Sequence, residues 1–271
     1  MNKLFKLLLL TLFSVILIAF YSCKKDEPIP DENPSEKSGK LIFKFNHVID
    51  GQNIDYDTIK YVNEAGNKYG VNVIQYFVTD VTLHKSGGTS MMIDDWTDFA
   101  YVDTDIPTTL TWEVFDPIPI GNYDSITFTL GFNEIKNQSF MFVNPPEVNM
   151  VWPVYLGGGY HYLKINTKWI DTTGLARGCA WHLGIGQTYD SSGIVNGFIQ
   201  NYFTVGLPNS SFEITENNTK EIQIVMNVEN WFKNPNTYNF DDFGGDIMQT
   251  QAAMILGCEN GHDVFTIGYI Q

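Results

Sequence analysis

Positive charge and cysteine are both scarce in this sequence of 271 residues. It contains 16 Lys and Arg against 31 Asp and Glu, so its formal net charge is −15 at pH 7. Such an acidic chain repels a phosphate backbone, and we therefore expect no nucleic acid partner. The 3 cysteines are Cys23, Cys179 and Cys258, and none has the CxxC spacing of a common zinc site.

The signatures of common hydrolases and nucleotide-binding enzymes are also missing. The sequence has no GxSxG nucleophile elbow, no HExxH zinc motif and no phosphate-binding loop. Its carboxylates are numerous, but no spacing selects two of them as a glycosidase pair. We therefore expect that the protein is not an enzyme and has no catalytic residues.

An apolar run interrupted only by Thr11 and Ser14 occurs at the N-terminus. Lys3 and Lys6 precede the apolar stretch 7–20, and Ser22 stands just before Cys23. A basic start, a short apolar core and a small residue before the cleavage point are typical of a secretory signal. The Cys after the small residue resembles a bacterial lipoprotein signal, so we predict a lipoprotein signal peptide over 1–22 and lipidation of Cys23. The alternative is an ordinary signal peptide followed by an incidental cysteine.

The segment KKDEPIPDENPSEKSGK (24–40) is charged, contains proline and lacks aromatic residues. Such a composition cannot bury enough apolar surface to fold, which predicts a flexible tether over 23–39. The KKDE stretch resembles the export signal of Bacteroidetes surface lipoproteins, although a plain solvated linker is the alternative. The predicted location is the cell envelope, as an outer-membrane lipoprotein that is periplasmic or surface-exposed.

Residues 40–271 alternate between apolar and polar positions, as strands do. KLIFKFNHVI (40–49), the long apolar stretch 71–84, and segments 108–115, 159–170 and 178–187 all fit strands separated by turn residues. Segment 211–228 is predicted to be a hairpin with a polar turn. These features predict an all-β fold, an antiparallel β-sandwich, with one C-terminal helix over 246–261 and a last strand over 264–270.

Cys179 and Cys258 form an even pair once Cys23 is lipidated. In an oxidising compartment such a pair predicts a disulfide. The alternative is that both thiols are soft metal ligands.

Three of the five histidines, His47, His161 and His182, lie in predicted strands beside structured corners. Imidazole suits Cu, Zn and Ni, and a rigid β scaffold suits a site of two or three histidines. A hairpin of 159–168 with 178–187 places His161 either opposite His182 or a few rungs away, because the sequence does not fix the register. The alternative for each is a core histidine bonded to a backbone carbonyl. The glycines 157–159 fit either a corner or a close approach of a metal.

Several segments resemble the MbnP-like copper-binding proteins, many of which are lipoproteins of Bacteroidetes. The matching stretches are FNHVIDG (45–51), VIQYFVTDVTLH (73–84), IPIGNYDSITFTLGFN (118–133), MVWPVYLGGGYHYLKI (150–165), WHLGIG (181–186) and IMQTQAAMILGCENGHDVFTIG (247–268). The resemblance implies a β-sandwich over 40–271 that binds copper in the periplasm or at the surface. It also implies His161 and His182 as metal ligands and His47 as a third. In the best-described branch a di-haem peroxidase-like partner oxidises a tryptophan to kynurenine, and Trp152 lies in the matching position.

The sequence thus favours a lipid-anchored protein that acquires or buffers copper through a histidine site lined by Trp152. The alternative is a surface module that binds glycan or protein through exposed aromatic side chains without a metal. A third hypothesis is a structural lipoprotein whose histidines are incidental.

Overall fold

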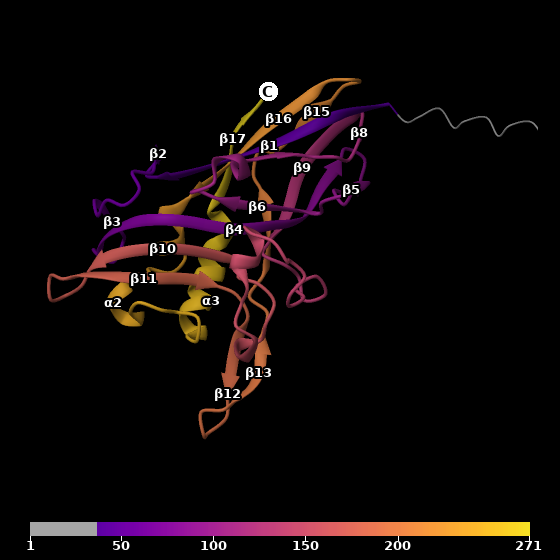
Figure 1. The fold of residues 1–271 in the computed structure, drawn as a ribbon. Helices are drawn as coiled ribbons and strands as arrows, with labels where there is room; N and C mark the ends of the chain where they lie inside the picture. The colour runs from indigo at the N-terminus through magenta and orange to yellow at the C-terminus, as the bar shows by residue number, and fades with distance from the viewer. Residues whose placement is uncertain (1–36) are drawn as a thin grey trace, which may run out of the picture. The chain divides into compact units, whose positions relative to one another are not determined.

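Alternating apolar residues build two β-sheets in the part of the chain that the structure describes, residues 37–271 (Figure 1). The structure is a computed structural model, and residues 37–271 form one unit in it. The predicted signal peptide (1–22), Cys23 and nearly all of the predicted tether (23–39) lie outside the described residues. None of the helices in residues 37–271 is long and apolar enough to cross a membrane.

The first sheet contains six strands. They are Ser38–Ile49 (β1), Gln52–Asn53 (β2), Thr111–Glu113 (β7), Ile118–Pro119 (β8), Thr219–Asn227 (β16) and Phe265–Ile270 (β17). They run in the order β17-β16-β1-β2, and β7 and β8 also pair with β1. The β1–β16 pair is parallel, with Phe43 beside Ile222, whereas the other pairs are antiparallel.

The second sheet contains nine strands, all paired antiparallel. They are Tyr61–Val62 (β3), Lys68–Lys85 (β4), Ser90–Met92 (β5), Phe99–Asp103 (β6), Gly121–Leu130 (β9), Leu163–Ile170 (β10), Ala176–Leu183 (β11), Phe203–Leu207 (β14) and Phe212–Ile214 (β15). The main order is β11-β10-β4-β9-β14. The predicted all-β sandwich is therefore confirmed, although one central pair is parallel. The predicted hairpin 211–228 is wrong, because β15 joins the second sheet and β16 joins the first.

Buried side chains lie on both faces of the second sheet. Between the sheets, Phe43 and Phe45 of β1 share one core with Tyr76 of β4. Since successive strand residues point to opposite faces, Phe77 lies on the outer face, in a separate buried cluster that includes Tyr160. That outer face is therefore covered by the segment that follows β9. It includes the short helices Glu147–Met150 (η2) and Val154–Leu156 (η3) and leads into β10.

The C-terminal helix predicted over 246–261 is confirmed as Gln251–Asn260 (α3), and a single helical turn, Phe240–Phe243 (α2), precedes it. Helix α3 packs on β11, since a Cβ added to Gly257 would lie 2.8 Å from Trp181 Cζ2. The remaining elements are Pro107–Leu110 (η1), Val228–Phe232 (η4), Gly261–Asp263 (η5), and the strands Gly186–Tyr189 (β12) and Val195–Ile199 (β13). Strands β12 and β13 form a separate two-stranded hairpin, which extends away from both sheets in Figure 1.

The two cysteines of the domain are free thiols in the structure, so the predicted disulfide is not formed. Cys179 on β11 donates a hydrogen bond to the Gly244 carbonyl, at 3.6 Å, while Cys258 on α3 donates to the Asn201 carbonyl, at 3.3 Å. The thiols are thus held by carbonyls of different segments rather than by each other. Burial raises the pKa of both thiols to about 12, which also disfavours the thiolate that a metal ligand requires.

Candidate metal centre

The structure brings His161 and His182 into contact on the outer face of the second sheet. Their ring centroids are 5.1 Å apart and the rings are nearly perpendicular, at 83°. In the β10–β11 pair, His182 lies opposite Lys164, so His161 is not its direct partner across the strands. His161 instead lies just before β10, where the chain arrives from the covering segment. The contact between the rings is therefore diagonal, which the sequence left open.

The three consecutive glycines form the corner that places His161 beside Trp152. Gly157, Gly158 and Gly159 have φ values of 119°, 71° and 75°, all in the left-handed region that favours glycine. The chain folds back on itself, so that the backbone N–H of Trp152 donates to the Gly159 carbonyl at 2.8 Å. As a result the Trp152 and His161 rings lie 4.7 Å apart.

We expect Gly159→Ala to destabilise the domain by about 3 kcal/mol, the sum of left-handed strain and steric overlap. A Cβ at this position would lie 2.5 Å from Asn137 Cγ, and the Asn137 amide oxygen accepts the Tyr160 N–H. Urea denaturation measures the loss. The matched control is Gly174→Ala in the β10–β11 turn, where φ is +83° but nothing lies within 4 Å of an added Cβ. That control should lose only about 1 kcal/mol, and equal losses would contradict a packing role for Gly159.

Hydrogen bonds fix which nitrogen of each ring is free. His161 Nδ1 lies 2.9 Å from the Met150 carbonyl oxygen, which can only accept, so Nδ1 carries the proton. His182 Nε2 lies 2.8 Å from the side-chain oxygen of Asn166 and donates to it in the same way. The other two nitrogens, His161 Nε2 and His182 Nδ1, are buried without a hydrogen-bond partner. Each neutral imidazole therefore keeps one unpaired lone pair, the condition of a metal ligand whose other nitrogen is held by a neighbour.

Burial keeps both rings neutral. His161 is 6% exposed and His182 is 8% exposed. Burial lowers the pKa of His161 to about 4 and that of His182 to about 2, because the charged imidazolium loses its hydration. At neutral pH neither nitrogen must lose a proton before it can bind a metal ion.

Trp152 closes the other side of the pair and is fully buried, at 0% exposure. Its indole N–H donates to the Leu156 carbonyl at 3.1 Å. The ring also needs the absence of a side chain at Gly184, because a Cβ there would lie 2.5 Å from Trp152 Cε3. The predicted lining residue thus contacts the pair through His161.

His47 does not join His161 and His182. It lies on β1 of the first sheet, and its ring contacts Tyr76 at 5.7 Å. Tyr76 faces the core between the sheets, and so does Trp181, the neighbour of His182. His182 therefore points to the opposite face of the second sheet. Burial lowers the pKa of His47 to about 3, and its Nε2 is buried without a partner.

Sequence reasoning missed the polar side chains that support the pair. Strand β10 alternates buried Leu163 and Ile165 with Lys164 and Asn166, which puts the two polar residues on the same face as His182. Asn166 orients His182, and Lys164 lies directly opposite it. The alternation itself was the available signal, but it became informative only once the register of the hairpin was known.

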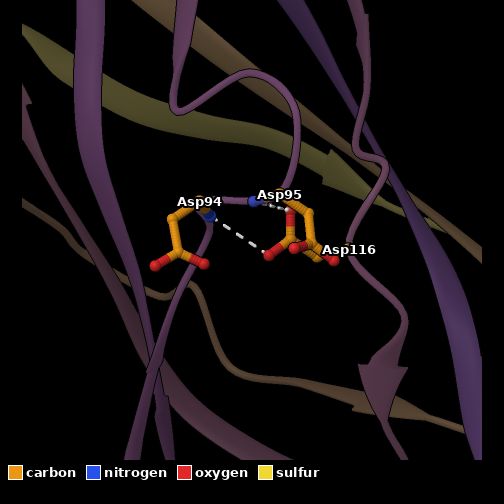
Figure 2. A group of neighbouring side chains, drawn as sticks. All are labelled: Asp94, Asp95 and Asp116. Atoms are coloured by element: carbon orange, nitrogen blue, oxygen red, sulfur yellow. Dashed lines mark hydrogen bonds between the residues drawn. The ribbon is translucent and has the colours of Figure 1, made fainter.

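A group of three carboxylates lies elsewhere, on the loops that follow β5 and β7. Asp94, Asp95 and Asp116 are the one set of three or more candidate ligand side chains found close together within residues 37–271, with ligand atoms within 4.8 Å. Figure 2 shows that the Asp116 carboxylate accepts the backbone N–H groups of Asp94 and Asp95, at 3.1 and 3.2 Å. Asp116 thus fixes the conformation of the loop, and we assign no metal to this group.

Comparisons with known proteins agree with the fold. The family model described as MbnP matches residues 38–249. Among solved structures, the chain is similar to MbnP from Methylosinus trichosporium, with 16% identity and a TM-score of 0.50 over 74% of this chain and 80% of that chain. At this identity the likeness shows the fold alone. No curated protein matches the chain.

Proposed function

Because the chain belongs to the MbnP family, we propose that it binds copper through His161 and His182. The observation that supports this most is the pair of buried nitrogens, His161 Nε2 and His182 Nδ1, that have no hydrogen-bond partner. A buried polar atom without a partner is costly, and a metal ion bound between two neutral imidazoles would satisfy both atoms. The Met150 carbonyl and the Asn166 side chain would hold the rings in the orientation that binding requires.

The proposed role is to acquire or buffer copper, without turnover chemistry. Trp152 would exclude water from the His161 side of the ion. Its conversion to kynurenine by a di-haem peroxidase-like partner stays a prediction from the family resemblance. Lipidation at Cys23 and a location in the outer membrane, facing the periplasm or the cell surface, stay predictions from the N-terminal sequence.

Metal loading tests the proposal directly. The purified protein, stripped of metal, would be loaded separately with Cu(I), Cu(II) and Zn(II), and the bound metal and the intact mass would be measured. We expect one tightly bound copper ion per chain. A mass change in the peptide that carries Trp152, in protein from its native host, would support the modification. Failure to retain any copper would contradict the proposal.

A second candidate function is a surface module for glycan or protein, and one exposed aromatic pair favours it. Trp96 is 92% exposed and Phe115 is 66% exposed, with ring centroids 6.2 Å apart. Aromatic rings that face solvent suit sugar or protein contacts. This function predicts binding to polysaccharide that persists in metal-free protein and is lost in Trp96→Ala.

A further inference from the structure

Lys164 is a half-buried neighbour of the histidine pair. Copper binding by the two histidines does not by itself explain why a positive charge lies beside them. It lies on β10 directly opposite His182, and strand alternation puts its side chain on the same face as that ring. Besides burial, the dominant cause, its positive charge helps to lower the pKa of both His161 and His182. Both rings therefore lie within reach of this charge.

Lys164 forms no ion pair within residues 37–271. Burial lowers the pKa of its ammonium group, and the charge of Asp103 offsets part of that shift. Lys164 belongs to a row of paired residues across the outer face, His182–Lys164–Gln75–Asp103. Asp103 stands at the far end, separated from Lys164 by Gln75. Its carboxylate is already engaged by the Gln75 amide and the Tyr101 hydroxyl, both at 2.7 Å, and by the Asp105 N–H at 2.9 Å.

We infer that Lys164 makes the histidine pair selective for a monovalent metal ion, Cu(I), over divalent ions such as Zn(II) and Cu(II). The inference rests on the proposed function. The two imidazoles are neutral, so a bound ion keeps its full charge beside the Lys164 ammonium group. Repulsion grows in proportion to the charge of the ion, and a divalent ion therefore suffers twice the penalty of Cu(I). Two nitrogen donors also suffice for Cu(I), which accepts two-coordinate geometry, whereas zinc prefers four ligands.

The size of the effect follows from Coulomb's law. At an effective dielectric constant of about 20, one unit charge about 12 Å away changes an equilibrium by about tenfold, and a closer charge changes it by more. Removing the Lys164 charge should therefore tighten Cu(I) binding by about tenfold or more and Zn(II) binding by about a hundredfold or more. The preference for Cu(I) over Zn(II) would fall by about tenfold or more.

The test compares Lys164→Met, which keeps most of the side-chain volume, with Lys168→Met. Lys168 lies on the same strand and face, but it is exposed and pairs with Gly178 and Gly70 at the other end of β10. Both variants remove one positive charge, but only Lys164 lies opposite His182. Only Lys164→Met should therefore change the ratio of Cu(I) to Zn(II) affinity. Lys164→Arg, which keeps the charge, should keep the preference of the natural protein for Cu(I) over Zn(II).

Competition titrations with chromophoric chelators measure the affinities, and the electron paramagnetic resonance signal of Cu(II) measures divalent binding independently. At equal concentrations of added Cu(II), the signal of protein-bound Cu(II) should be larger for Lys164→Met than for the natural protein. An unchanged affinity ratio in a Lys164→Met protein that still binds Cu(I) would overturn this inference and leave the proposed function standing. Absence of Cu(I) binding in the natural protein would overturn both.

Discussion

Replacing either His161 or His182 by alanine is expected to weaken copper binding by roughly a hundredfold or more. Loss of groups that merely orient a ligand already costs about 10–100-fold in metal affinity, and loss of a ligand itself should cost more. The two side chains supply the buried nitrogens without partners, His161 Nε2 and His182 Nδ1. One remaining imidazole cannot hold the ion between two donors. Chelator competition and metal analysis after desalting would measure the loss.

His47 supplies the matched control for these variants. It is also buried, also has an Nε2 atom without a partner and also has a lowered pKa. It differs in position, because it faces the core between the sheets. His47→Ala should therefore keep copper binding within about twofold, a change of about 0.4 kcal/mol. Equal losses in His47→Ala and His161→Ala would show either a third ligand or a general loss of structure, which circular dichroism would distinguish.

Asn166→Leu separates orientation from ligation in the same experiment. The side-chain oxygen of Asn166 accepts the His182 Nε2–H, and this bond selects the tautomer that frees Nδ1. Leucine has a similar volume but cannot accept a hydrogen bond. We expect copper affinity to fall by about 10–100-fold, less than in His182→Ala. An Asn166→Leu protein with unchanged affinity would contradict this role.

Local pattern was enough to predict the strands and the C-terminal helix, but it could not decide which sheet each strand joins. Segment 211–228 has two alternating runs around a polar turn, the pattern of a hairpin. In the structure Phe212 pairs with Tyr123 in the second sheet, whereas Ile222 pairs with Phe43 in the first. These partners lie far away in the sequence, so the pairing depends on the rest of the fold.

The same limit applies to the site. His161 and His182 were predicted together because a short turn makes their strands neighbours. His47 had equal local signals, a strand and an adjacent turn, but the two faces of a sheet are set by packing of the whole domain. Lys164 and Asn166 read as ordinary solvent-facing residues of a strand. Their roles follow only from the register that places Lys164 opposite His182.

Acid is expected to unfold the metal-free protein well above the pH at which carboxylates titrate. His47, His161 and His182 have folded-state pKa values lowered to about 3, 4 and 2, against an ordinary value of about 6.5 in the unfolded chain. Below about pH 6.5 these three histidines bind protons in the unfolded chain but not in the folded protein, so the free energy of unfolding falls as the pH falls. The loss continues for each histidine until its folded-state pKa is reached.

The expected slope distinguishes this mechanism from carboxylate titration. Each neutral buried histidine costs at most about 1.4 kcal/mol per pH unit, so the three together cost at most about 4 kcal/mol per unit below pH 6. Asp and Glu contribute mainly near their ordinary pKa values of about 4.

Urea denaturation at fixed pH values from 7.5 to about 4.5 would measure the free energy of unfolding. His47→Leu should reduce the slope by about one third. A free energy of unfolding that stays constant between pH 7 and about 5 would contradict buried neutral histidines. Copper should shift the acid transition to lower pH, because an ion that binds His161 and His182 in the folded protein, and not in the unfolded chain, stabilises the folded state.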